Sequence, residues 1–209
     1  MKKVILASGS PRRKELMTQA QIPFEIKVSW CEEKITKEKP EEVVLELAEQ
    51  KAEAVARNTK EEVIIIGADT VVALDEKIMG KPHDRKEAFH MIKDLQGRVH
   101  QVWTGVVLLE CKDGKIQQRQ SFAQKTDVEV YSMEEEEIWN YIGTEEGGNI
   151  EEGKREWEDK AGGYGIQSVF GAKYIKRING DYYNVVGLPI SRLYQVLIKK
   201  YNIEHLYGS

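Results

Sequence analysis

The sequence predicts an α/β protein with a substantial sheet. Apolar runs of strand length alternate along the chain with stretches of helix length. The longest of these runs, VIIIGA and VVLL, fall well short of the ~20 residues that span a bilayer. Charged residues make up 32% and hydrophobic residues 41% of the 209 residues, which is typical of a soluble globular protein with enough chain to bury a core.

The predicted elements follow one another closely. Lys3 to Ala7 forms the first strand, and a helix from Pro11 to Ala20 follows it. Apolar residues spaced by three and four predict an amphipathic helix over 40–58. Further strands are expected at 24–29, 63–74, 99–110 and 121–131, and further helices at 85–95 and 133–141. A Gly-rich loop, two short strands and a helix over 189–201 complete the chain, and the highly charged stretch 144–159 predicts an exposed loop.

Charge and cysteine content exclude several classes of protein. The formal net charge is −4, so binding to a nucleic acid polymer through a basic surface is not expected. Cys31 and Cys111 provide neither a disulfide framework nor a Cys-based metal spacing. The first seven residues lack the apolar stretch of a signal peptide, so we expect a cytoplasmic protein without a membrane partner.

The start of the first helix is the most informative local feature. Ser10 suits the N-cap, and Pro11 suits the first helical position. Arg12 and Arg13 then fall in the turn where the helix dipole disfavours cations, so an anion is expected there. Backbone N–H groups, the Ser8 and Ser10 hydroxyls and both guanidinium groups would together hold a polyphosphate. The alternative is an ordinary surface helix with two solvated arginines.

A carboxylate interrupts the predicted core strand at 63–74. Asp69 and Thr70 lie between two apolar runs, and a buried carboxylate needs a cation, a metal or a donor network. Asp69 is therefore a metal ligand or general base at a strand end, or it bonds a loop backbone. Glu32 and Glu33 follow the second strand and could add an oxygen ligand for Mg²⁺ or Mn²⁺, or they are surface acids.

Other polar residues are weaker candidates. Lys51, within the amphipathic helix, and Lys81, in GKP, could reach phosphate oxygens or could face solvent. The Gly-rich stretch DKAGGYGIQ would let backbone approach a ligand, with Gln167 offered to a base edge, or it is a plain turn with Tyr164 packed in the core. The G-x-x-x-x-G-K-[ST], H-E-x-x-H and G-x-S-x-G motifs are absent.

Five motifs occur in order along the chain: SGSPRRKEL, GADTVV, GKP, DKAGGYGIQ and NVVGLPIS. This set closely resembles the Maf family of nucleoside triphosphate pyrophosphatases. The resemblance implies one Maf-like domain over residues 1–209. Its fold would be an elongated, mixed and twisted sheet flanked by helices, like that of the inosine triphosphatase superfamily, with a cleft between two lobes. It also implies hydrolysis of a small-molecule nucleoside triphosphate to the monophosphate and diphosphate with a divalent cation, and a homodimer as the family's usual assembly.

The variants of these motifs imply a substrate. Arg12, Thr70 and Gln167 match the branch that resembles dTTP and UTP pyrophosphatases rather than the 7-methyl-GTP branch, so the resemblance assigns them to specificity. It implies that Asp69 accepts the proton of the attacking water. Asp69 would also hold the metal together with Glu32. The groups expected to grip the triphosphate are Arg12, Arg13, Lys51 and Lys81.

Other functions stay open at this point. Maf-like proteins are also associated with arrest of septum formation, so the chain could be a nucleotide-binding regulator. A 7-methyl-GTP pyrophosphatase is a further alternative. A housecleaning role on modified pyrimidine nucleotides is compatible with the main hypothesis.

Overall fold

The computed structural model describes residues 2–143 and 156–201. Most of the charged stretch at 144–159 lies outside this range. The chain forms two compact units. The first comprises Met1–Thr70, Trp103–Gln124 and Tyr183–Ser209, and the second comprises Val71–Val102 and Lys125–Tyr182. The expectations of a single domain over 1–209 and of a cleft between lobes stay predictions.

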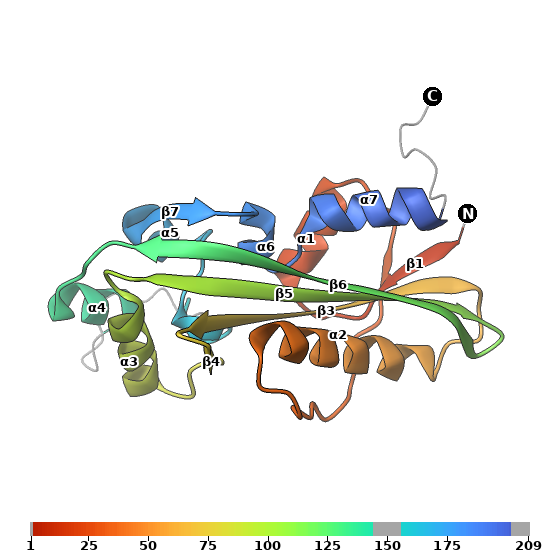
Figure 1. The fold of residues 1–209 in the computed structure, drawn as a ribbon, viewed down its shortest axis with the longest axis horizontal. Coiled ribbons are helices and arrows are strands. Elements are labelled where there is room, and N and C mark those ends of the chain that lie inside the picture. Colours follow the sequence, from red (N-terminus) through yellow and green to blue (C-terminus); the bar gives the residue numbers. More distant parts are fainter. Residues whose placement is uncertain (1, 144–155, 202–209) are drawn as a thin grey trace. The chain divides into compact units, whose positions relative to one another are not determined.

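The described residues contain a mixed seven-stranded sheet in the order β2-β1-β3-β5-β6-β7, with β4 paired to β3 (Figure 1). Strand β1 pairs in parallel with β2 and β3, whereas β4 pairs antiparallel with β3, and β7 pairs antiparallel with β6. The strands are β1 (Lys3–Leu6), β2 (Glu25–Ile26), β3 (Val63–Leu74), β4 (Lys77–Met79), β5 (Val99–Lys112), β6 (Lys115–Val130) and β7 (Ile175–Asn179). The predicted mixed sheet flanked by helices is confirmed.

Helices of the first unit cover both faces of its strands. These helices are α1 (Pro11–Gln19), α2 (Pro40–Ala56) and α7 (Ile190–Tyr201), and α6 (Tyr182–Val186) precedes α7. Figure 1 shows α2 on one side of the strands and α1 and α7 on the other. A buried cluster that includes Ile65, Val107 and Leu109 packs beneath Ala48 and Ala52 of α2.

The second unit packs its own helices, which are α3 (Arg85–Leu95), α4 (Glu135–Ile142), α5 (Val169–Tyr174) and a 3₁₀ turn at Ala161–Gly163. Helices α3 and α4 meet where the Phe89 and Trp139 rings stack with centroids 4.3 Å apart. The buried His100 ring places Nε2 2.6 Å from the Tyr164 hydroxyl. Burial lowers the pKa of His100 to about 4, so this ring is neutral at pH 7.

Two predicted elements differ from the structure, and two observed elements were not predicted. The residues before Pro189 form the short helix α6 rather than a strand, so of the two expected late strands the described residues contain only β7. Strand β6 begins at Lys115 instead of 121, because Asp113 and Gly114 both adopt positive φ and close a tight turn directly after β5. Strand β4 and helix α5 were not predicted, because they are only three and six residues long.

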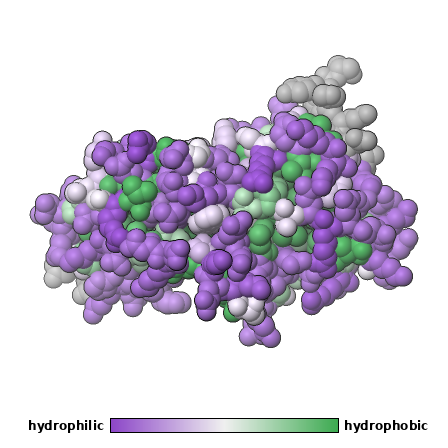
Figure 2. Space-filling model, viewed as in Figure 1, coloured by the Kyte–Doolittle hydropathy of each residue, from purple (hydrophilic) through white to green (hydrophobic). Residues whose placement is uncertain are grey.

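The face of the molecule drawn in Figure 2 is largely hydrophilic, with hydrophobic residues in small separate areas. Among the helices of the described ranges, none has the length and apolar character needed to cross a membrane.

Two glycines let helix α2 lie directly on the sheet. A Cβ atom at Gly67 of β3 would run into the Ala48 carbonyl oxygen and would lie 2.9 Å from the Ala52 Cβ. A Cβ atom at Gly105 of β5 would collide in the same way with the Val44 carbonyl oxygen. Any larger residue at either strand position would therefore push the helix away from the sheet.

We expect Gly67→Ala to lower the free energy of unfolding by about 2 kcal/mol, because the added methyl group meets helix backbone that cannot move aside. Gly80→Ala is the matched control, since a Cβ atom at Gly80 has no neighbour within 4 Å. Urea unfolding of both variants measures the difference. Equal losses in the two variants would contradict the close-contact explanation.

Candidate active site

A lysine between two carboxylates forms the polar centre of the first unit. Lys51 Nζ makes a short ion pair with Asp69 Oδ1 and lies 3.1 Å from Glu33 Oε1. The side chains of Lys51 and Asp69 are each only 14% exposed, so the Asp69 carboxylate has the cation that its burial requires. The structure thus brings together two of the predicted site residues, Lys51 and Asp69.

The position of Lys51 follows from the contact between α2 and β3. Residues 48, 51 and 52 lie on one face of α2, and Gly67 lets that face approach the strand. Because side chains alternate along a strand, Asp69 points to the same face as Gly67. The ammonium of Lys51 therefore meets the carboxylate of Asp69 without any adjustment of the backbone.

Glu33 is the acid that sequence reasoning passed over in favour of Glu32. Both side chains are exposed, but Glu33 makes the ion pair with Lys51. The chain after Glu33 is fixed to α2, because the Lys34 N–H donates to Gln50 Oε1 at 2.9 Å. The role of Glu32 as a metal ligand stays a prediction. Two adjacent glutamates gave no signal in the sequence to choose between them.

Arg13 is buried and its guanidinium is held by four hydrogen bonds. Nε donates to the Gly187 carbonyl at 2.8 Å, and Nη1 donates to the Ala68 carbonyl at 2.9 Å and to Ser8 Oγ at 3.2 Å. Nη2 donates to Thr70 Oγ1 at 3.1 Å. A guanidinium has five N–H groups, so these bonds leave at most one for a phosphate. Its predicted contact with substrate stays a prediction, whereas its link between three chain segments is structural fact.

Burial lowers the pKa of Arg13, and the nearby Asp69 carboxylate acts in the opposite direction. The Ala68 carbonyl, which accepts from Arg13, lies on β3 just beyond the end of its pairing with β1. Ala7 N–H donates to the Ile66 carbonyl, and in a strand the carbonyl two residues on points to the same side. The Arg13 side chain therefore continues the hydrogen bonding of the strand edge after β1 has turned away.

The loop before α1 adopts the predicted arrangement. Ser10 is the N-cap residue and Pro11 occupies the first turn, although Ser10 makes no side-chain capping bond. Its N–H instead donates to Ser8 Oγ at 3.2 Å. Ser8 is buried, while Ser10 and Arg12 are half-buried. The contacts of these three residues with a phosphate stay predictions.

Thr70 belongs to a hydroxyl network on the face of β3 opposite Asp69. Thr104 Oγ1 donates its only hydroxyl proton to the Asn184 carbonyl at 3.1 Å. Thr70 Oγ1 lies 2.9 Å from Thr104 Oγ1 and 3.4 Å from the Gly187 carbonyl, and it accepts from Arg13. Sequence reasoning did not single out Thr104 or the Gly187 carbonyl. In the sequence, only the NVVGLPIS motif pointed to Gly187. Its φ of +129° lies in a region that favours glycine.

Lys81 and Gln167 belong to the second unit and are both exposed. Their loops meet within that unit, since the Gly162 N–H donates to the Gly80 carbonyl at 2.9 Å. Tyr164 is packed in the core, which was one of the two interpretations of the Gly-rich stretch. Burial raises the pKa of its hydroxyl. The roles of Lys81 and Gln167 toward a nucleotide stay predictions.

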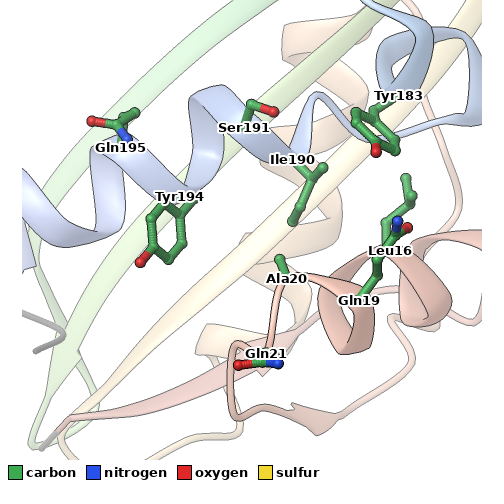
Figure 3. Close-up of a pocket in the computed structure, with 9 residues that line it drawn as sticks. All are labelled: Leu16, Gln19, Ala20, Gln21, Tyr183, Ile190, Ser191, Tyr194 and Gln195. Atoms are coloured by element: carbon green, nitrogen blue, oxygen red, sulfur yellow. The ribbon is translucent and has the colours of Figure 1, made fainter. Parts of the chain in front are cut away.

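A pocket of about 480 Å³ lies elsewhere in the first unit. Figure 3 shows its lining residues, which come from the C-terminal part of α1, the turn after it, α6 and the start of α7: Leu16, Gln19, Ala20, Gln21, Tyr183, Ile190, Ser191, Tyr194 and Gln195. None of the predicted site residues is among them. The lining carries no charged group, so it lacks the cations that a triphosphate needs.

The described residues contain no group of three or more His, Cys, Asp or Glu side chains arranged to hold a metal. Mg²⁺ is commonly held by one or two carboxylates together with substrate phosphates and waters. The largely buried Asp69 carboxylate, with Glu33 on the same lysine, fits that smaller donor set. The residues present are therefore compatible with a hard divalent cation that arrives with a phosphate ligand.

Comparisons with known proteins identify the family of the chain. The family model for Maf-like proteins matches residues 3–200, and the chain belongs to the Maf family. It is 46% identical to the dTTP/UTP pyrophosphatase of Thermoanaerobacter pseudethanolicus over 204 residues. This match covers 98% of this chain and 100% of the relative. It is 48% identical to the dTTP/UTP pyrophosphatase of Bacillus cytotoxicus, over 94% of this chain and 95% of the relative.

A similar solved structure is the Ham1 protein of Staphylococcus aureus. It is 14% identical, has a TM-score of 0.42 and covers 62% of this chain and 72% of that chain.

We expect Arg13→Lys to lower the free energy of unfolding by about 3 kcal/mol, because one ammonium cannot reach the Gly187, Ala68 and Thr70 oxygens together. Arg12→Lys is the matched control at a half-buried position, and its expected loss is below about 1 kcal/mol. Chemical unfolding at neutral pH measures both. A loss that is the same for the two variants would show that the four hydrogen bonds of Arg13 do not stabilise the fold.

Proposed function

We propose that this chain hydrolyses dTTP and UTP to the nucleoside monophosphate and diphosphate with the help of Mg²⁺ or Mn²⁺. The observation that carries the proposal is the sequence identity of 46% and 48%, over nearly the whole chain, to two relatives named dTTP/UTP pyrophosphatase. The ion-paired Lys51 and Asp69 on facing elements support it, since both residue types are needed to handle a triphosphate and its cation.

In the proposed mechanism, Asp69 accepts a proton from the attacking water at its carboxylate. Arg12, Lys51 and Lys81 bind the phosphate oxygens, and the backbone N–H groups at the start of α1 orient them. Arg13 holds the Ser8 hydroxyl in place and adds its positive charge. A divalent cation held by Asp69 and Glu32 would neutralise the phosphate oxygens when bound. Thr70 and Gln167 would select the pyrimidine nucleotide.

Lys51 contacts both Asp69 and Glu33 in the structure. Its ammonium balances the charges of Asp69 and Glu33, which keeps two carboxylates close together at a position where they would otherwise repel. When a triphosphate is bound, its oxygens compete with these carboxylates for the same ammonium. Lys51 would then contact phosphate, and Asp69 would be free to act on water.

The test is a substrate panel on the purified protein. We expect diphosphate release from dTTP and UTP with Mg²⁺ or Mn²⁺, and much slower release from CTP, GTP and 7-methyl-GTP. Asp69→Asn should lower kcat by at least about a hundredfold, because the amide cannot accept the proton, while its circular dichroism spectrum stays that of the wild type. Nucleotide binding without diphosphate release would favour a regulator. A preference for 7-methyl-GTP would overturn the substrate assignment.

The two adjacent glutamates provide a sharper test of the metal site. Glu33 contacts Lys51, so we expect Glu33→Gln to leave Mn²⁺ affinity within about threefold of the wild type. Glu32→Gln should weaken it by about tenfold or more, because it removes a proposed oxygen ligand. Electron paramagnetic resonance of Mn²⁺ with a non-hydrolysable UTP analogue measures both affinities. The reverse order of effects would assign the metal to Glu33.

A further inference from the structure

Exposed apolar residues occupy every second position from the edge strand β2 onward. Ile26 and Val28 are each 42% exposed, and Trp30 is 91% exposed. We call these three residues, which alternate with less exposed neighbours, the 26–30 stripe. An indole left almost wholly in water is an unusual arrangement, because Trp combines a large apolar surface with a strong tendency to stack.

The stripe begins beside the loop proposed to bind phosphate. The two methyl groups of Val28 lie 3.6 and 3.7 Å from where a Cβ atom of Gly9 would be, and Gly9 lies between Ser8 and Ser10. The backbone at this end is fixed to the sheet, since the Lys27 N–H donates to the Leu6 carbonyl at 3.1 Å. Val28 therefore forms an apolar wall against the turn that precedes α1.

The stripe ends three residues before Glu33, the acid that contacts Lys51. Trp30 is three residues before Glu33, so the two Cα atoms are at most about 10–11 Å apart. Glu33 contacts Lys51, and Thr36 N–H donates to Glu46 Oε2 of α2 at 2.9 Å. Trp30 thus lies in the chain between Lys27, whose N–H is bonded to β1, and Glu33, which contacts Lys51.

We propose that the exposed indole of Trp30 is the platform on which the base of the bound nucleoside triphosphate stacks. The inference rests on the proposed function. Phosphates at the Ser8–Ser10 turn and Asp69 leave the sugar and base to extend over neighbouring surface. Val28 lies against Gly9 of that turn, and the exposed Trp30 precedes by three residues Glu33, which contacts Lys51. Stacking on an aromatic ring tolerates any base, so Trp30 adds affinity while polar groups select the base.

The experiment compares a nucleotide with a base-free ligand. Isothermal titration calorimetry measures the affinity of the full chain for a non-hydrolysable UTP analogue and for inorganic tripolyphosphate, both with Mg²⁺. We expect Trp30→Ala to weaken the affinity for the analogue by at least about tenfold and to leave the affinity for tripolyphosphate unchanged. Trp30→Phe should retain most of the affinity. Ile35→Ala, at a 60% exposed apolar position of the same segment but outside the stripe, should change neither ligand.

Three results would overturn the platform. The first is an unchanged affinity of Trp30→Ala for the analogue. The second is an equal loss for analogue and tripolyphosphate, which would mean that Trp30 only shapes the phosphate site. The third is a smaller particle mass for Trp30→Ala by light scattering with nucleotide affinity intact, which would assign the stripe to a second copy of the chain. Failure of the proposed function is recognised separately, as absence of diphosphate release by the wild type.

Discussion

The direct contact between helix α2 and strand β3 determines where the polar centre of the first unit lies. Gly67 has no side chain, so the Ala48–Ala52 turn of the helix rests on strand backbone. Lys51 belongs to that turn and Asp69 lies two residues beyond Gly67 on the same face, so the ion pair forms where the two backbones are closest. The apolar packing of the core and the position of the charged pair are consequences of one contact.

Arg13 joins parts of the chain that are far apart in sequence. Its acceptors lie in the turn after β1, in β3 and at Gly187. One guanidinium therefore connects the SGSPRRKEL, GADTVV and NVVGLPIS motifs. Thr70 extends the connection through Thr104 to Asn184. Networks of this kind specify one arrangement, because each buried polar group loses its partner if any segment moves.

The sequence predicted those features that depend on local pattern. Helix α2 and strand β3 were expected within two residues of their observed ends, since their apolar periodicity is strong. One of the two late strands was expected to end before Pro189, but residues Tyr182–Val186 form helix α6. The carbonyl partners of Arg13 were beyond prediction, because residues 68 and 187 meet only in the fold. The choice between Glu32 and Glu33 likewise depends on the path of a loop.

The two arginines of α1 solve the same electrostatic problem in different ways. A cation in the first turn of a helix is unfavourable unless negative charge or dipoles oppose the exposed N–H groups. For Arg13, the carbonyl oxygens of Ala68 and Gly187 provide those dipoles within the protein. Its charge is therefore fixed in place by the protein, so the proposed phosphate at the Ser8–Ser10 turn would require no reorganisation of Arg13. A positive charge held in this way attracts an anion without having to contact it, so direct contact can be left to the half-buried Arg12.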